Sequence, residues 1–353
     1  MIRLATLRRG RLLQTLFPDR WNGALSAFAL AFIGWAMWQA FDWAVLRAAL
    51  APDAERCFAD GVGACWGVIT EKHRALLFGR YPYAEQWRPM LAVGVLLLAV
   101  VITLFPRSPR ALRIAVWLPA LPVFFALMAG GVAGLTPVPS RQWGGLPLTV
   151  MLWLLAVAIA LPVGVLTAMG RHSGLPAVRT LCGLFVELLR GVPLVSILFM
   201  ASFMVPLLLP PEARVDMLLR VQVALGLFGG AYLSENIRGG IQAVPAGQVQ
   251  AALSLGMTPR QADWLVVLPQ ALRHALPAMF NSFIGLFKET TLVTVVSLYE
   301  LTGSLSLAIG GDPVWRPFFL EAYLFIGAIY WLCCFSLSRY SRGLERRLAA
   351  TSA

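Results

Sequence analysis

Charged residues are scarce in this sequence. Asp, Glu, Lys and Arg together make up only 13% of its 353 residues, whereas 59% are hydrophobic and the mean hydropathy is +0.73. Lysine is almost absent, since Lys72 and Lys288 are its only two positions. Several apolar runs are long enough to cross a bilayer about 30 Å thick. The composition therefore excludes an ordinary soluble domain and predicts an all-α polytopic membrane protein.

Motifs of the common chemistries are also missing. There is no GxxxxGK[ST] sequence, so the chain cannot itself form a phosphate-binding P-loop. Its three histidines are scattered without the spacing of a metal site, and no catalytic set of nucleophile, base or paired carboxylates stands on adjacent helical turns. We therefore expect no enzymatic activity, no metal and no cofactor on this chain.

Positive charge is the exception, because the formal net charge is +12. In a soluble protein this charge would suggest nucleic-acid binding, but here the basic residues cluster in short segments between apolar runs, as they do on the cytoplasmic side of a membrane protein. An even number of spans, about eight, places both termini in the cytoplasm, with the basic segments 8–11, 107–113, 171–179 and 338–347 on that side. The predicted spans are 24–46, 90–105, 114–134, 147–169, 180–208, 217–235, 267–287 and 318–338.

One long loop, residues 47–89, does not follow this charge pattern. It is rich in Arg and Lys but also carries acidic residues, and long loops have little influence on topology. We therefore place the loop outside, in the periplasm. Cys57 and Cys65 lie in it and could form a disulfide there. The other cysteines lie in apolar runs, where packing is their expected role: Cys182, Cys333 and Cys334.

Between the sixth and seventh predicted spans lies the segment QVQAALSLGMTPRQADWLVVLP (248–269). Just before it, Pro245 suits the first position of a helix, and Gly256 suits the left-handed residue that ends one. Thr258 and, three residues later, Gln261 form the pattern of a capping box, which begins a second helix. The sequence therefore predicts a short helical hairpin with a tightly specified turn.

This hairpin resembles the EAA loop of the membrane subunits of ATP-binding-cassette importers. The resemblance implies that the loop 238–266 docks on a separate ATPase subunit, because small residues let a protruding helix seat closely in a groove. Gln250 departs from the pattern, since the family usually has Glu there, so charge-dependent contacts do not carry over. An ordinary amphipathic loop would explain the helices but not the turn together with Leu-Pro at this distance. The residues implied to couple to the ATPase are Gly247, Gln250, Ala251, Ala252, Gly256 and Pro269.

Further segments are similar to the permeases of polar amino-acid importers over about residues 140–350. They are LLRGVPLVSILF (188–199), AYLSENIRGGIQAVPAGQ (231–248), LPQALRHALPAMFN (268–281), FKETTLVTVVSLYELTG (287–303) and SRGLERRL (341–348). The resemblance implies a type I importer core of five helices in residues 140–345. Residues 1–139 then form an extension of three helices, whose segments GACWGVI (63–69) and FGRYPYAEQWRP (78–89) resemble the larger membrane subunit of general L-amino-acid importers of Gram-negative bacteria.

The same resemblance implies an assembly in the bacterial inner membrane. ATP would bind to two ATP-binding cassette subunits. A second permease subunit would form a heterodimer with this chain, and a periplasmic amino-acid-binding protein would complete the assembly. The expected function is the ATP-driven import of L-amino acids from periplasm to cytoplasm. A stand-alone secondary transporter or channel is the alternative, but it would need its own coupling-ion site, and carboxylates within the spans are few.

Ionisable residues at membrane depth are costly unless they face protein or water, so each one is a candidate for function. Glu187 and Arg190 are three residues apart on a predicted helix and can pair, beside a kink at Gly191 and Pro193. They form either a structural ion pair or a contact to substrate. Three further residues are expected to cap a helix or lie at the interface: Glu235, Arg238 and Glu300.

The second candidate is the run Lys288, Glu289, Thr290 and Thr291. A cation, an anion and hydroxyl groups complement the carboxylate and ammonium of an α-amino acid. Related permeases carry Lys-Asp-Thr or a close variant at this position, and here Glu289 replaces the Asp. The alternative is a salt-bridged helix end at the membrane interface.

Overall fold

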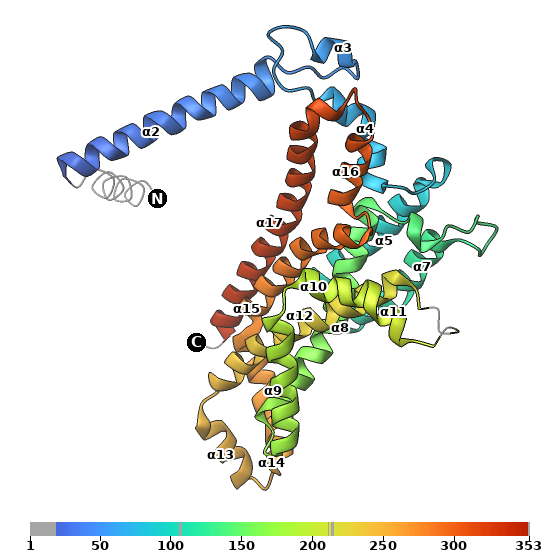
Figure 1. Cartoon of the computed structure of the whole chain (residues 1–353). Coiled ribbons are helices and arrows are strands. Elements are labelled where there is room, and N and C mark those ends of the chain that lie inside the picture. Colours follow the sequence, from blue (N-terminus) through green and yellow to red (C-terminus); the bar gives the residue numbers. More distant parts are fainter. Residues whose placement is uncertain (1–18, 106–107, 211, 213–214, 352–353) are drawn as a thin grey trace. The chain divides into compact units, whose positions relative to one another are not determined.

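The long apolar runs fold as helices, because a backbone in lipid must satisfy its hydrogen bonds within its own segment. The computed structural model describes residues 19–105, 108–210, 212 and 215–351, and within these ranges no β-strand forms (Figure 1). The chain divides into two units. The first comprises Met1–Glu71 and Val314–Ala322, and the second comprises Lys72–Pro313 and Tyr323–Ala353.

The first unit contains a long apolar helix, α2 (Arg20–Phe41), which continues as a π-helix, η1 (Asp42–Leu46), and is followed by the short α3 (Ala54–Cys57). Asp19 caps α2: the backbone N–H of Asn22 donates to its carboxylate at 2.8 Å, and this bond lowers the pKa of Asp19. No residue of α2 is buried. Its apolar side chains are therefore consistent with a span surrounded by lipid or by other chains.

A disulfide closes the loop of the first unit. Cys57 and Cys65 are bonded, with their Cα atoms 5.5 Å apart. The backbone N–H of Cys65 donates at 3.0 Å to the buried carboxyl group of Glu321, which is 256 residues away in the chain. The rings of Phe58 and Phe318 also lie 5.1 Å apart. These contacts join the two stretches of chain that make up this unit.

The second unit begins with an N-terminal group of helices, in which α5 packs along α7. The helix α4 starts in the first unit and continues into the second. The elements are α4 (Gly67–Phe78), the 3₁₀-helix η2 (Tyr83–Glu85), α5 (Trp87–Leu104), α6 (Arg110–Ala115), α7 (Trp117–Ala129) and the 3₁₀-helix η3 (Ser140–Gln142).

A buried arginine fastens the start of α5 to the end of α7. Arg88 is 0% exposed, and its guanidinium donates to the carbonyl of Leu127 at 2.8 Å and to that of Thr136 at 2.9 Å. Beside it, the hydroxyl of Tyr81 donates to the carbonyl of Met128 at 2.9 Å, and burial raises the pKa of Tyr81. Carbonyl acceptors thus replace water at Nε and Nη1 of the buried guanidinium, whereas Nη2 has no hydrogen-bond partner among the described residues.

A core of longer helices follows, in which α12 packs between α8 and α15. Its elements are α8 (Gly145–His172), α9 (Pro176–Gly191), α10 (Leu194–Phe199), the π-helix η4 (Met200–Met204), α11 (Val205–Leu208), α12 (Met217–Gln242) and α15 (Leu268–Glu289). The chain bends by 103° between α9 and the segment that follows it. Pro193 lies at this bend, where a proline interrupts the helical hydrogen bonds.

Close approach of α12 to its neighbours depends on glycine. A Cβ added at Gly226 would overlap the side chain of Ile159 on α8, and one added at Gly240 would overlap the carbonyl oxygen of Ala271 on α15. Farther along the same interface, the amide of Asn236 donates to the hydroxyl of Ser282 at 2.7 Å. Small residues and interhelical hydrogen bonds are the usual means by which membrane helices associate.

The C-terminal part consists of the 3₁₀-helix η6 (Thr290–Val296), α16 (Leu301–Gly310), the 3₁₀-helix η7 (Arg316–Phe318) and α17 (Phe319–Thr351). Glu300 caps α16, since its carboxyl group accepts the backbone N–H of Thr302 at 2.8 Å and that of Gly303 at 3.0 Å. The capping role expected of Glu300 is therefore confirmed.

The sequence predicts about eight spans, and the described residues contain slightly fewer helices that qualify by length and composition. Among the described residues, six helices are long and apolar enough to cross a membrane, and the bent pair at 176–208 makes seven if it is one span. The predicted span 267–287 does form a helix, α15, but polar residues interrupt its apolar sequence. An all-α polytopic chain is confirmed. The division at residue 139 stays a prediction, and the basic segment 8–11 lies outside the described residues.

Candidate functional site

The hairpin that follows α12 has the turn that the sequence predicts. Its first helix, α13 (Ala246–Ser254), ends just before Gly256, whose φ of +83° lies in the left-handed region. The N–H of Met257 then donates to the carbonyl of Ala252 at 3.2 Å, which is the long bond of a Schellman motif. Pro245 is the N-cap of α13, one position earlier than predicted, because its ψ of 134° is not helical.

A capping box begins the second helix of the hairpin, α14 (Pro259–Ala262). The hydroxyl of Thr258 accepts the N–H of Gln261 at 3.3 Å, and the side chain of Gln261 accepts the N–H of Thr258 at 2.9 Å. The predicted capping box is confirmed. A π-helix, η5 (Asp263–Val267), then leads into α15. Both sides of the turn are therefore fixed by local hydrogen bonds.

Most residues with a predicted coupling role lie on the hairpin surface. Five of the six are exposed: Gly247, Gln250, Ala251 and Gly256 on the hairpin, and Pro269 at the start of α15. The sixth, Ala252, is only 4% exposed and packs inside the hairpin. Leu255, at the end of α13, is 83% exposed. The hairpin thus offers a surface of small residues with one projecting leucine, which suits contact with another protein.

Three arginines converge on Glu235 near the end of α12. The nearest guanidinium nitrogens lie 2.5 Å from its carboxylate for Arg171, 2.7 Å for Arg238 and 3.2 Å for Arg190. The cluster joins α8, α9 and α12, so Glu235 is a shared ion-pair partner rather than a helix cap. The pair suggested between Glu187 and Arg190 does not form, because Arg190 pairs with Glu235 instead.

Glu289 lines a small cavity of about 120 Å³ between α8, α12 and α15. The other walls include Ser282 of α15 and the rings of Phe228 and Tyr232 of α12. The guanidinium carbon of Arg190 lies 5.5 Å from the centre of the Tyr232 ring, so α9 contributes a cation next to one wall. A carboxylate, a hydroxyl and aromatic walls form a set that can hold a small molecule with an amine.

The neighbours of Glu289 in sequence are not directed into this cavity. Lys288 is exposed and is not among the lining residues. Thr290 is buried and donates to the carbonyl of Phe287 at 2.7 Å, whereas Thr291 donates to the carbonyl of Lys288 at 2.9 Å. Successive helical residues point about 100° apart. The cation, anion and hydroxyls therefore do not converge at one point within this chain.

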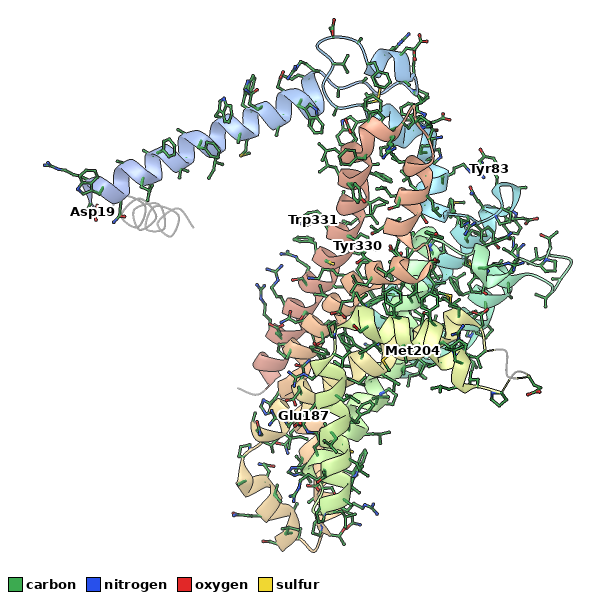
Figure 2. The ribbon with its side chains drawn as sticks, viewed as in Figure 1. Asp19, Tyr83, Glu187, Met204, Tyr330 and Trp331 are labelled. Atoms are coloured by element: carbon green, nitrogen blue, oxygen red, sulfur yellow. A yellow bond between two sulfur atoms is a disulfide. The ribbon has the colours of Figure 1, made fainter. Side chains whose placement is uncertain are left out.

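A larger hollow, of about 500 Å³, contains Glu187 of α9, which Figure 2 labels. Residues of α8 and α12 form its other walls, including Arg171 and Arg238. The two predicted substrate-binding groups thus face different spaces, Glu187 the larger hollow and Glu289 the small cavity. Arg190 does not line either space. Its guanidinium lies against the ring of Tyr232, which is part of the wall of the small cavity, and also pairs with Glu235.

Two residues of the small cavity, Tyr232 and Ser282, were not among the predicted site residues. Tyr232 lies inside the segment 231–248 that resembles the permeases, Ser282 lies just after the segment 268–281, and neither carries a charge that marks it. The available signal was helical spacing, since Ser282 and Glu289 are seven residues apart and share a face of α15. In the part of the chain that the structure describes, no group of three or more His, Cys, Asp or Glu residues could hold a metal ion.

The family model described as "Binding-protein-dependent transport system inner membrane component" matches residues 160–350. This range contains the hairpin, the Glu235 cluster and both cavities. The match therefore covers every candidate site except the disulfide.

Two relatives extend over most of the chain. The inner membrane amino-acid ABC transporter permease protein YhdY of Escherichia coli is 41% identical, and the alignment covers 89% of this chain and 86% of the relative. The glutamate/glutamine/aspartate/asparagine transport system permease protein BztC of Rhodobacter capsulatus is 33% identical, with 95% and 92% covered. A crystal structure of an amino acid ABC transporter with histidines is 32% identical, covers 57% of this chain and 92% of its own, and has a TM-score of 0.51.

Proposed function

This chain belongs to the family of binding-protein-dependent transport system inner membrane components and is the permease subunit of an amino-acid ABC importer. On that premise, we propose that it moves L-amino acids from periplasm to cytoplasm with energy from a separate ATPase subunit. As a multi-pass protein of the inner membrane, it supplies the path across the bilayer. Both termini would lie in the cytoplasm, and the loop 47–89 in the periplasm.

The observation that carries the coupling role is the geometry of the hairpin α13–α14. Its turn is fixed by Gly256 and by the capping box of Thr258 and Gln261, so movement of a bound partner would be transmitted instead of being absorbed by a loose loop. The exposed Leu255 and the small residues beside it supply the contact surface. The helix α12 ends at Gln242, shortly before α13 begins at Ala246, and α15 follows η5 directly. The hairpin is therefore joined to two helices that line the small cavity.

The assembly that follows from this role has four kinds of chain. Two ATP-binding cassette subunits would seat the coupling hairpins, a second permease subunit would form a heterodimer with this chain, and a periplasmic amino-acid-binding protein would deliver the substrate. ATP binds to the cassette subunits, and this chain needs no cofactor of its own. ATP-driven closure would then move the paired cores from inward-open to outward-open.

The substrate contact is assigned to the small cavity. The carboxylate of Glu289 would accept the ammonium group of the amino acid. The guanidinium of Arg190, which lies beside the ring of Tyr232, would bind the carboxylate group. Lys288, exposed at the same helix end, would attract the carboxylate on its way in or out. Thr290 and Thr291 hold the local backbone, and Glu187 faces the larger hollow, so we assign these three residues no direct substrate contact.

The experiment that tests this function is uptake into proteoliposomes. The full complex with its binding protein should accumulate labelled L-amino acids only when ATP is supplied to the ATPase side. Uptake by this chain alone, without ATPase subunits or ATP, would instead establish the stand-alone secondary transporter or channel.

A further inference from the structure

The larger hollow lies where two apolar spans end. Its walls come from the last turn of α8, from α9 and from the last turns of α12, and its volume is about 500 Å³. The candidate spans Gly145–His172 and Met217–Gln242 both end at this level. The hollow therefore lies at the edge of the apolar layer, where a protein meets the headgroups of lipids.

Positive charge dominates around the hollow. Arg171 and Arg238 line it and share the carboxylate of Glu235 with Arg190, so a single anion faces three guanidinium groups. Arg179 adds another guanidinium: its side chain is exposed and makes no hydrogen bond or ion pair with the described part of the chain. Basic pockets between membrane helices suit phosphate-bearing headgroups.

One carboxylate in the hollow also has no partner among the described residues. Glu187 lies on the same helix as Arg179, about two turns farther along, and both line the hollow. A free phosphate ion would be attracted by the arginines but repelled by Glu187. A ligand that joins a phosphate to an amine can satisfy both kinds of charge.

An apolar stripe runs along α9 beside this charged wall. Leu181, Leu184 and Leu188 are 67%, 58% and 66% exposed, and Leu184 also lines the hollow. Their spacing of three and four residues places them on one face of the helix. A charged wall next to a leucine stripe is typical of helices at the membrane interface.

We propose that the hollow binds the headgroup of a membrane phospholipid. The phosphate diester lies against Arg179 and Arg238, the amine of an aminophospholipid such as phosphatidylethanolamine lies toward Glu187, and the acyl chains follow the leucine stripe of α9. Thr180 supplies a neutral hydrogen-bonding group to the headgroup. The lining residues are different from those of the cavity beside Glu289, so this is a second site and not an extension of the substrate site.

Two substitutions test the site without breaking a described contact. Gly183 lines the hollow, and an added Cβ meets no atom within 4 Å, so Gly183→Leu fills the space with a better helix former. Arg179→Gln removes a guanidinium that has no described partner. The matched control is Arg342→Gln, which removes the same charge from an exposed position on α17.

The measurement is native mass spectrometry of the complete importer complex in detergent, titrated with short-chain phosphatidylethanolamine. We expect wild type and Arg342→Gln to bind the lipid equally, and Gly183→Leu and Arg179→Gln to bind it about tenfold more weakly. Inorganic phosphate at the same concentration should leave the lipid bound.

Three results would overturn the proposal. The first is wild-type lipid affinity in both variants. The second is displacement of the lipid by inorganic phosphate at equal concentration, which would make the hollow a site for soluble anions. The third is the absence of bound lipid in wild type together with weakened subunit association in Gly183→Leu, which would mean that a partner subunit covers this wall.

Discussion

The hydroxyl of Tyr330 on α17, a residue that Figure 2 labels, donates to the carboxyl group of Glu300 at 2.6 Å, and this bond closes a network at the start of α16. Glu300 is 0% exposed and also accepts from Thr149 of α8 and Thr294 of η6. One carboxyl group thus connects α8, η6, α16 and α17. All the groups that donate to it in the described structure are neutral: two backbone N–H groups and three hydroxyls.

The first prediction concerns this network. Tyr330→Phe removes one hydrogen bond to a charged or strongly polar acceptor, which is worth about 2 kcal/mol, and should lower the midpoint of thermal unfolding. Glu300→Gln should lower it more, because an amide nitrogen would face a donor on one side of the network. The readout is thermal unfolding of the purified complex. The control is Tyr340→Phe on the same helix, because the hydroxyl of Tyr340 makes no hydrogen bond with the described part of the chain and its ring contact with Phe280 is kept. Equal midpoints for Tyr330→Phe and wild type would refute the role of this bond.

The local structure of this region could be read only partly from the sequence. The position of Glu300 before an apolar run suggested a cap, and it is one. The sequence could not show that the hydroxyl of Tyr330, 30 residues later, reaches the same carboxyl group. Local hydrogen bonds follow from spacing along one helix, whereas contacts between helices depend on packing that no short pattern records.

The second prediction tests the coupling surface. Leu255→Asp places a charge on the exposed leucine at the end of α13 and should greatly weaken binding of the ATPase subunit, measured by co-purification from membranes. Gln250→Glu is the matched control, because it adds the same charge to the same hairpin but restores the residue usual in similar loops. Retained ATPase in Leu255→Asp, or equal losses in both variants, would contradict docking through Leu255.

The third prediction separates Glu289 from Lys288. Glu289→Gln keeps the size of the side chain in the small cavity but removes the charge that would hold the ammonium group, so ATP-dependent uptake should fall by about tenfold or more. Lys288→Gln should have a smaller effect, because Lys288 does not line the cavity. The readout is the initial rate of uptake at several substrate concentrations, with ATPase activity measured in parallel. A larger loss of uptake in Lys288→Gln than in Glu289→Gln would place the substrate contact on the exposed surface of α15 instead of in the small cavity.

The substrate residues illustrate where sequence reasoning stops. Charges within an apolar chain identified both Glu187 and Glu289 as candidates, because such residues are rare and costly. The sequence placed them in one functional class, yet the structure places them in separate spaces. The sequence also suggested a pair between Glu187 and Arg190 from helical spacing. In the structure, Arg190 instead forms an ion pair with the carboxylate of Glu235 on another helix. Helical spacing predicts which residues can meet, and the neighbouring helix decides which of them do.

The fourth prediction concerns the disulfide of the first unit. Cys57 and Cys65 should resist thiol labelling in the oxidised protein and become reactive after reduction and unfolding. The free cysteines Cys182, Cys333 and Cys334 serve as internal controls, since reduction should not change their labelling in the unfolded chain. Mass spectrometry of the labelled peptides gives the result. Labelling of Cys57 and Cys65 before reduction in the unfolded chain would exclude the bond and, with it, the argument for an oxidising compartment around this loop.

The last prediction uses two adjacent glycines of α12 that differ in their surroundings. A Cβ at Gly240 would overlap the carbonyl oxygen of Ala271 on α15, whereas a Cβ at Gly239 meets no atom within 4 Å. Gly239→Ala should therefore stabilise the protein by up to about 1 kcal/mol, the difference in helix propensity between the two residues. Gly240→Ala should destabilise it, because α12 and α15 must separate to relieve the overlap, and this separation also disturbs the cavity that the two helices share. Both variants are measured in the full complex. The midpoint of thermal unfolding should rise in Gly239→Ala and fall in Gly240→Ala, and uptake should fall only in Gly240→Ala. The same shift in both variants would show that helix propensity, and not the contact with Ala271, determines the effect of the substitution at position 240.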